Sequence, residues 1–164
     1  MKTLKLALLA TTLLASSAQA DLYGGGHYSQ FSDGDISLNG LGVTVGYEHS
    51  LTPKFDAIIE MKAGIGIKDE SHQGVKVELD NYKIFSAKAK YRINSGFYAL
   101  AILSRATIDL EADFQGQEVE TSDNETGFGL GLGYDFETSR IDTELTYEKF
   151  DGFDIVTVNF KFDF

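Results

Sequence analysis

The stretch that decides the fold is VTVNFKFDF, residues 156–164. Valine or phenylalanine occupies every second position, and a polar or charged residue lies at each position between them. This period of two is typical of a β-strand that presents one apolar and one polar face. The row Phe160, Phe162 and Phe164 therefore predicts a strand whose apolar face needs a covering, because exposing phenylalanine to water is unfavourable.

The same alternation recurs along the chain. Aromatic residues, which favour strands, are frequent, with 12 Phe and 8 Tyr. Proline, which interrupts strands, occurs only once, at Pro53. No helical pattern longer than a turn or two follows residue 20. We therefore predict an all-β fold with eight strands, in segments near residues 22–31, 41–49, 55–67, 83–93, 98–110, 127–136, 140–148 and 156–164.

The first residues, MKTLKLALLATTLLASSAQA, follow a different pattern. Two lysines flank the start of an apolar run over residues 6–15, and a small-x-small cleavage site ends at Ala20. The apolar run is shorter than the ~20 residues that a spanning helix needs. We predict a cleaved signal peptide over residues 1–20 and one exported domain over residues 21–164, with a retained anchor as the alternative.

Composition excludes some partners and some stabilising bonds. The formal net charge is −11, so the chain should repel nucleic acid, and we expect no nucleic-acid partner. There is no cysteine, so disulfides cannot stabilise the exported domain. The acidic stretches at residues 33–35 and 69–70 lack the spaced ligands of a calcium loop, and we expect no metal and no cofactor.

Two architectures share this alternation. A water-soluble barrel or sandwich buries its apolar faces, whereas an outer-membrane barrel turns them to lipid and lines its inside with polar residues. The connections alternate between tight ones, near residues 49–53, 94–96 and 137–139, and long acidic ones, around residues 68–81 and 111–125. Aromatic residues lie close to the tight connections, namely Tyr47, Phe55, Tyr91, Tyr98, Tyr134, Phe136 and Phe164. Both features predict an eight-stranded antiparallel up-and-down transmembrane β-barrel with N- and C-termini in the periplasm.

The NFKFDF ending resembles the C-terminal assembly signal of bacterial outer-membrane proteins, here carried by Phe160, Phe162 and Phe164. With its predicted signal peptide and strands, the whole mature chain is similar to the small eight-stranded outer-membrane barrels, the OmpX/Ail group and the transmembrane domain of OmpA. The resemblance implies a place in the bacterial outer membrane, contact with lipid and lipopolysaccharide, and insertion by the barrel assembly machinery. It also implies a non-enzymatic role in envelope integrity or surface interaction. We expect a monomer, because nothing in the sequence marks an oligomer face.

Charged residues of both signs fall on the predicted inner face. Eight strands enclose room for side chains only, and buried charges need partners. We therefore predict a mutually neutralising network, in which the glycine row of residues 127–133 leaves room for long basic side chains. Such a barrel is a plug, and a gated conduction path is the alternative. The predicted network consists of Glu48, Glu60, Lys62, Lys88, Lys90, Arg92, Arg105, Asp142, Glu144, Glu148 and Lys161.

Alternation continues beyond the width of a membrane in the middle of the chain. Leu79 is in phase with Phe85, so residues 75–93 and 97–114 are predicted to be paired strands. At about eighteen residues and a ~40° tilt, each would span ~45 Å, against an apolar band of ~25 Å. The excess predicts a small acidic sheet outside the cell, whose edge accepts a strand from an extracellular protein. The alternative is that these residues form ordinary solvated loops.

Two further alternatives belong to other classes of protein. His27-Tyr28-Ser29 places an imidazole and a hydroxyl on one face of a strand and resembles the His-x-Ser of barrel lipid A deacylases, although in that family the motif lies late in the chain. A lipid A-modifying hydrolase is therefore one alternative, and we predict that the chain is not an enzyme. A periplasmic lipocalin-like carrier is the other; it requires an apolar interior, and the lipocalin Gly-x-Trp motif is missing because there is no Trp.

Overall fold

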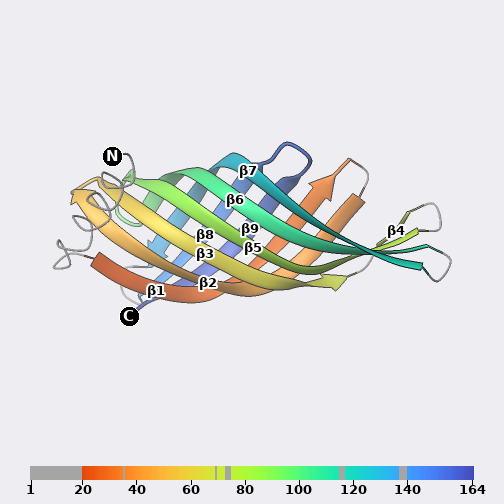
Figure 1. The fold of residues 1–164 in the computed structure, drawn as a ribbon. Helices are drawn as coiled ribbons and strands as arrows, with labels where there is room; N and C mark the ends of the chain where they lie inside the picture. Colours follow the sequence, from red (N-terminus) through yellow and green to blue (C-terminus); the bar gives the residue numbers. More distant parts are fainter. Residues whose placement is uncertain (1–19, 35, 69, 73–74, 115–116, 137–139) are drawn as a thin grey trace, which may run out of the picture.

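The computed structural model describes residues 20–34, 36–68, 70–72, 75–114, 117–136 and 140–164, so the predicted signal peptide lies outside them apart from Ala20. Within these described residues, nine strands form one sheet with antiparallel neighbours (Figure 1). No helix among these residues is long and apolar enough to cross a membrane. The strands are β1 (Ala20–Asp33), β2 (Ile36–Thr52), β3 (Phe55–Lys68), β4 (Glu70–His72), β5 (Val75–Arg92), β6 (Phe97–Phe114), β7 (Gln117–Phe136), β8 (Ile141–Lys149) and β9 (Asp154–Asp163).

The sheet closes on itself. Its order is β3-β2-β1-β9-β8-β7-β6-β5-β4, and β3 also pairs with β5, so all strands except the short β4 form the wall of a barrel. The terminal strand β9 pairs with β1 from Tyr23↔Asp163 to Ser32↔Asp154. Closure satisfies the backbone groups that an open edge would leave unpaired. The predicted eight-stranded antiparallel barrel is confirmed.

The barrel is apolar outside and charged inside. Leu130 is 70% exposed and Val43 is 67% exposed, whereas Lys62 and Glu144 are fully buried. A water-soluble protein does not expose a continuous apolar belt of this size, because such a patch drives association. The arrangement excludes the lipocalin-like carrier, which needs the apolar faces inward.

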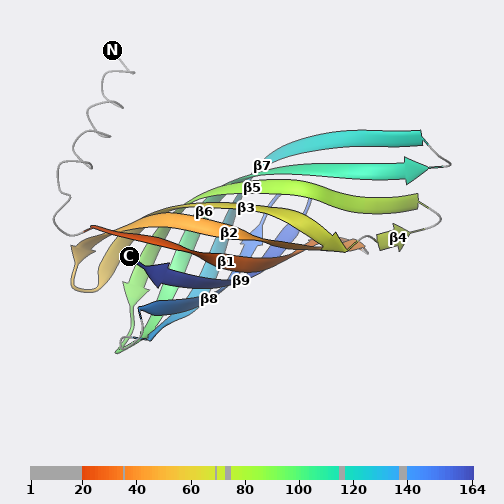
Figure 2. The ribbon, with the colours of Figure 1, turned by 90° about the horizontal axis from the view of Figure 1, so that it is seen from below.

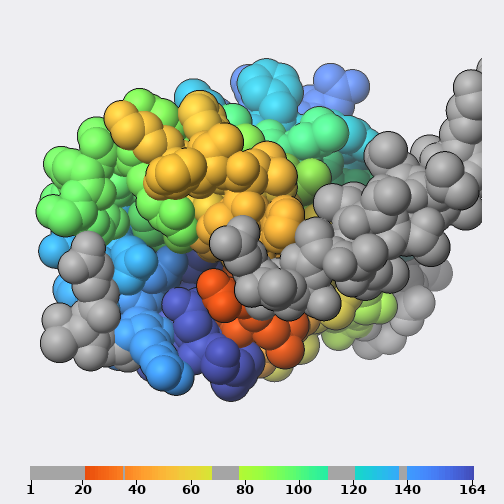
Figure 3. All heavy atoms as spheres, turned by 90° about the vertical axis from the view of Figure 1, so that its left-hand side faces the viewer, coloured from red at the N-terminus to blue at the C-terminus, as the bar shows by residue number. Residues whose placement is uncertain are grey.

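The two ends of the barrel differ (Figures 1 and 2). One end, which we call the turn rim, carries the ends of the described chain and the tight connections at residues 53–54 and 93–96. Gly96 has φ of 90°, in the left-handed region that glycine adopts without a steric penalty. The third predicted tight connection, residues 137–139, lies outside the described residues. Figure 3 looks onto the turn rim, with the β2–β3 connection in yellow-orange, the β5–β6 connection in green and the C-terminal strands in blue.

The opposite end, which we call the extension rim, is where β5, β6 and β7 run on past the other strands (Figure 2). Strands β5 and β6 have 18 residues each, as predicted. Strand β7 has 20 residues, so the prediction of a long loop over residues 111–125 is wrong. The polar stretch at the start of β7 shows no alternation, and it forms a strand because β6 offers backbone partners from Phe114↔Gln117 onwards.

The predicted phase of β5 is also wrong. The pairing of β5 with β6 shifts between Leu79 and Asn81, which is the signature of a β-bulge. As a result Leu79 points inward at 1% exposure, whereas Phe85 points outward at 55% exposure. One extra residue in a strand exchanges its two faces, and a two-residue period read across the bulge cannot detect this.

Aromatic side chains surround the turn rim on the outside. Phe55 packs against Tyr91 with ring centroids 4.9 Å apart, and Phe97 packs against Tyr134 at 4.7 Å. Tyr98, which was predicted to belong to this girdle, is instead buried inside the barrel at 1% exposure. The prediction fails because β6 is apolar on both faces near this end, so alternation does not say which face is inside.

The interior has two halves of different chemistry. Near the turn rim it holds the charged side chains together with Tyr23, Ile58 and Tyr98. Near the extension rim it is an apolar core, which the prediction of a polar interior missed. The apolar core consists of Phe31, Leu38, Leu79, Tyr82, Ile84, Ala106, Ile108, Phe150 and Ile155.

Candidate functional site

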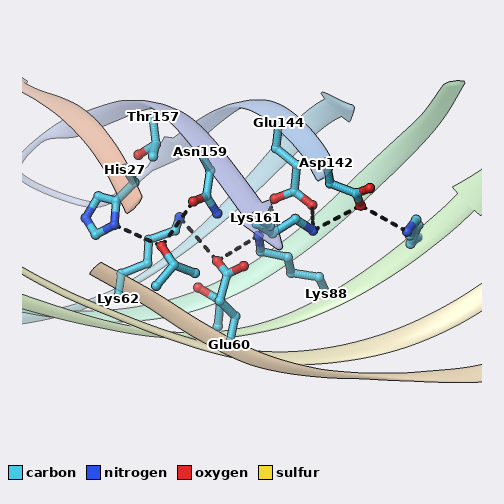
Figure 4. Close-up of polar contacts among 12 residues, drawn as sticks. His27, Glu60, Lys62, Lys88, Asp142, Glu144, Thr157, Asn159 and Lys161 are labelled. Atoms are coloured by element: carbon cyan, nitrogen blue, oxygen red, sulfur yellow. Dashed lines mark hydrogen bonds and ion pairs between the residues drawn. The ribbon is translucent and has the colours of Figure 1, made fainter. Parts of the chain in front are cut away.

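The candidate site is the charged half of the interior, where lysines lie between carboxylates (Figure 4). The Lys88 ammonium is 2.7 Å from Glu60 Oε1 and 2.9 Å from Glu144 Oε2. The Lys62 ammonium is 3.5 Å from Glu60 Oε1 and 3.2 Å from Glu148 Oε1. All these side chains are fully buried, so each charge depends on its neighbours for the stabilisation that water would otherwise provide.

A second group of charges continues toward the turn rim. Lys161 is within ion-pair distance of Glu144 and is 3.7 Å from Asp142. Lys90 is 3.6 Å from Asp142 and 3.0 Å from Glu48. Asp142 and Glu144 thus each contact two lysines, and the network runs unbroken from the middle of the barrel to its rim.

At the rim itself the network meets solvent. Arg92 is 2.9 Å from Asp56 Oδ2 and 3.4 Å from Glu48 Oε1. The Arg92 side chain is 40% exposed, whereas that of Asp56 is fully buried. Arg92 is therefore the member of the network that contacts solvent. A long arginine side chain can keep its guanidinium group partly in water while it pairs with buried carboxylates.

Two tyrosines lie against glycines on neighbouring strands. A Cβ added to Gly46 would lie 2.2 Å from the Tyr23 ring, and one added to Gly133 would lie 2.2 Å from the Tyr98 ring. The missing side chains therefore create the space that the rings fill. The prediction that the glycine row of β7 accommodates basic side chains is wrong at Gly133, because an aromatic ring occupies that space.

The tyrosine hydroxyls join the charged network. Tyr23 donates to Glu60 Oε2 at 2.7 Å, and Tyr98 donates to Glu144 Oε1 at 3.2 Å. The Lys161 ammonium lies 4.5 Å from the centroid of the Tyr23 ring, which adds a cation–π contact. The rings thus fill volume and also donate hydrogen bonds to carboxylates that the lysines alone leave partly unsatisfied.

His27 and Ser29 point inward together but do not form a catalytic pair. The two ring nitrogens of His27 lie 2.9 Å from Thr44 Oγ1 and 2.8 Å from the Tyr82 hydroxyl. Ser29 Oγ lies 2.9 Å from Thr157 Oγ1. A serine nucleophile needs a hydrogen bond to its general base, and here both partners of that bond are engaged elsewhere. The geometry does not support the lipid A hydrolase alternative.

The structure places all of the predicted network residues toward the interior except Arg105. Arg105 is exposed and lies opposite Phe85 on the outer face of β6. As with Tyr98, the prediction fails because the inner and outer faces of β6 are exchanged relative to the predicted ones. Ser104, not Arg105, points inward and hydrogen-bonds to Glu148.

Sequence reasoning also missed members of the network. Asp56 lies on the predicted inner face of β3, so its charge was a usable signal. Tyr23 and Tyr98 carried no such signal, because a tyrosine suits the lipid interface as well as a polar interior. Among the described residues, no group of three or more His, Asp or Glu is arranged to hold a metal ion.

Two separate cavities open at opposite ends of the barrel in the part of the chain that the structure describes. A cavity of about 180 Å³ opens at the extension rim and another of about 340 Å³ opens at the turn rim, and they share no lining residue. Between them lie the fully buried Lys62 and Glu148 and the apolar core. This arrangement favours the plug over the conduction path.

The extension carries an unpaired strand edge. Strand β7 pairs with β6 along its whole length, but its pairing with β8 begins only at Phe128↔Lys149. The edge of β7 over residues 117–126, which we call the open edge, thus has no strand partner in the part of the chain that the structure describes. The opposite side of the extension is covered, since β5 pairs with β3 and β4.

A model of the outer membrane protein beta-barrel domain matches residues 3–163, nearly the whole chain. The chain belongs to this family. Its members span the outer membrane as closed barrels, which explains why the apolar belt of this barrel faces outward and its charges inward. Small barrels of this family are generally structural and not enzymatic.

Solved structures show which outer-membrane barrels share the fold. The attachment invasion locus protein Ail of Yersinia pestis has a TM-score of 0.63 at 16% identity, covering 88% of this chain and 97% of Ail. Neisserial surface protein A has a TM-score of 0.54 at 12% identity over 88% of this chain and 97% of that protein. The N-terminal barrel of Pseudomonas aeruginosa OprF has a TM-score of 0.53 at 13% identity over 89% of this chain and all of that barrel.

These identities are below 25%, so the likenesses establish the fold alone. No curated protein matches the sequence.

Proposed function

We propose that this outer-membrane barrel is a non-enzymatic surface-interaction protein, which binds an extended segment of an extracellular protein along the open edge of β7. The observation that carries the proposal is that, among the described residues, no strand pairs with the open edge of β7 while its other side is held by β6. An exposed edge of this kind recruits a further strand, because each added residue gains main-chain hydrogen bonds.

The charge of the open edge indicates the chemistry of the partner. Its sequence, QEVETSDNET, contains four acidic residues and no basic one. We therefore expect a basic partner strand. A structure of Ail from Yersinia pestis was solved in complex with the heparin analogue sucrose octasulfate, a polyanion. The acidic extension of this chain should not share that preference.

The proposed orientation places the turn rim in the periplasm and the extension rim outside the cell. Short turns on the periplasmic side and longer outer segments are the rule for such barrels. In this orientation outer-membrane lipid and lipopolysaccharide cover the apolar belt. The outward-facing Phe160, Phe162 and Phe164 are then the signal that the barrel assembly machinery reads, and the barrel functions as a monomer.

Cysteine labelling tests the orientation cleanly, because the chain has no native cysteine. Ser122 on the open edge and Ser95 in a tight turn are both exposed, which makes Ser122→Cys and Ser95→Cys a matched pair. A maleimide coupled to a polymer too large to cross the outer membrane should label Ser122→Cys on intact cells and Ser95→Cys only after the envelope is opened. The reverse result would invert the proposed orientation.

Strand addition is tested with the barrel in a neutral-lipid nanodisc. The probe is an alternating lysine–valine peptide, with an alternating glutamate–valine peptide and a proline-interrupted lysine peptide as controls. We expect only the lysine peptide to slow amide hydrogen exchange in residues 121–126, and to do so less at high salt.

A shortened variant supplies the matched protein control. Replacing residues 111–120 by Asn-Gly joins Leu110 to its cross-strand partner Thr121 through a two-residue turn. This shortens the open edge and leaves the barrel wall intact, as an unchanged heat-dependent gel shift would verify. Peptide affinity should fall roughly tenfold. Unchanged affinity of the truncated variant for the lysine peptide, or equal protection by the proline-interrupted peptide, would contradict strand addition.

A further inference from the structure

The mouth of the barrel at the extension rim holds an apolar cavity of about 180 Å³. The β1–β2 hairpin contributes Phe31, Ile36 and Leu38, and β6 contributes Ile108 and Leu110. Leu79 and Phe153 complete the apolar wall, while Ser32, Asp33, Asp123 and Gly152 add polar groups. The cavity shares no lining residue with the charged network, and Asp123 is the one lining residue that also belongs to the open edge.

The walls of this cavity are preformed. Phe31 packs edge-on against Tyr82 with ring centroids 4.8 Å apart, and lies 6.5 Å from the ring of Phe153. Phe153 in turn stacks on Phe150 at 4.7 Å. Buried Ile84 belongs to the same apolar core as Phe31, Tyr82 and Phe150. A ring framework held on several strands resists collapse, so the space persists without a ligand.

The volume sets the size of the occupant. An apolar cavity of about 150 Å³ lined by leucine, isoleucine and phenylalanine takes up benzene. The present cavity is slightly larger and has the same kind of lining, so it accommodates one phenyl ring with a short tail. It is too small for a whole lipid chain.

The carboxylates at the cavity set the charge of the occupant. Asp33 and Asp123 line the cavity, and both residues are exposed. In the part of the chain that the structure describes, neither carboxylate forms a salt bridge. An ammonium group attached to an apolar ring in the cavity would lie where both carboxylates attract it.

We infer that this cavity is a binding site for a small cationic amphiphile, with its aromatic or short alkyl group among Phe31, Leu79 and Leu110 and its ammonium group at Asp33 and Asp123. In the proposed orientation the ligand enters from outside the cell, and this part of the inference rests on the proposed function. Binding to the cavity itself does not depend on strand addition at the open edge.

The test uses the full barrel in neutral-lipid nanodiscs with labelled isoleucine methyl groups. Phenethylammonium is the probe; phenethyl alcohol and hydrocinnamate are its neutral and anionic counterparts. We expect phenethylammonium to shift the Ile36 and Ile108 methyl signals saturably, with a dissociation constant of about millimolar for so small a ligand. Ile59 and Ile65 face the lipid and report partition into the bilayer, which should not saturate.

Two variants separate the apolar and the charged contributions. Leu110→Trp fills the mouth of the cavity and should abolish saturable binding of both the cation and the alcohol. Asp33→Asn with Asp123→Asn should weaken the cation roughly tenfold and leave the alcohol unchanged. Asp21→Asn with Asp163→Asn makes the same charge change at the turn rim and should alter neither. The heat-dependent gel shift verifies that each variant is folded.

The outcomes are distinct. Shifts at Ile36 and Ile108 that do not saturate, that match those at Ile59, or that persist in Leu110→Trp would overturn the site. Equal affinity for the cation and the alcohol would overturn the cationic assignment. The truncated variant lacking residues 111–120 keeps every lining residue, so weakened peptide binding with unchanged phenethylammonium binding would separate this site from the proposed function.

Discussion

The two halves of the barrel interior are both filled by buried side chains, which are mainly charged in one half and apolar in the other. Near the turn rim, Lys88 is buried between two carboxylates at 2.7 and 2.9 Å. A few residues further along the same strand, Ile84 is buried to 0% exposure in an apolar core. The comparison teaches that burial alone does not define the interior of this barrel. The charged half requires every partner to be present, whereas the apolar half requires only that its volume be filled.

The largest expected effect comes from making the same substitution in each half. Lys88→Met keeps the length of the side chain but leaves Glu60 and Glu144 without a shared cation, and should lower the free energy of unfolding by about 3–5 kcal/mol. Ile84→Met keeps an apolar side chain of similar volume and should cost less than about 1.5 kcal/mol. Urea unfolding in lipid vesicles, followed by circular dichroism, measures both.

If Lys88→Met and Ile84→Met lose the same amount of unfolding free energy, the charged half does not depend on its partners more than the apolar half does. A further variant sharpens the comparison: adding Glu144→Gln to Lys88→Met removes one of the two carboxylates that lost a lysine and should recover part of the loss in unfolding free energy.

The next effect tests whether the apolar half is tightly packed. Ile84→Ala should lower the free energy of unfolding by about 2–4 kcal/mol, because a cavity remains in a core that several strands hold rigid. The same urea titration measures it. A loss no larger than that of Ile84→Met would show that the core collapses around the missing atoms.

A smaller effect is expected where a tyrosine lies against a glycine. Gly46→Ala places a Cβ 2.2 Å from the Tyr23 ring and should destabilise the barrel by about 1–3 kcal/mol. Gly26→Ala is the matched control, since its nearest atom would be 3.6 Å away, an ordinary contact. If both variants unfold at the same urea concentration, the ring does not depend on the glycine.

The smallest effect is expected at Arg105, the charge that does not belong to the network. Arg105 is exposed on the outer face of β6, so Arg105→Ala should change the free energy of unfolding by no more than about 0.5 kcal/mol. A loss of unfolding free energy comparable to that of Lys88→Met would indicate that Arg105 lies inside the barrel, and would contradict the assignment of the two faces of β6.

Most of the barrel wall was predictable, because the evidence for it is local. A strand with one face in lipid and the other among charges alternates residue by residue, as residues 156–164 do. This two-residue period does not depend on which strand lies beside it. The prediction failed where alternation is absent or interrupted. β6 is apolar on both faces near Tyr98, β5 contains a bulge near Asp80, and the start of β7 is polar except for Val119.

The candidate site was predictable in its chemistry but not in its contacts. The sequence by itself determined that lysines and carboxylates share one face of their strands, because they alternate with apolar residues, and the tight turns with their aromatic residues indicated that this face points inward. Only the tertiary structure decided which groups meet: Lys62 and Glu148 are 86 residues apart in the chain, and their contact depends on the register of every strand between them. The apolar cavity, the tyrosines against glycines and the open edge of β7 arise in the same way. Each depends on where separate strands begin and end relative to one another, and closure of the barrel sets those positions.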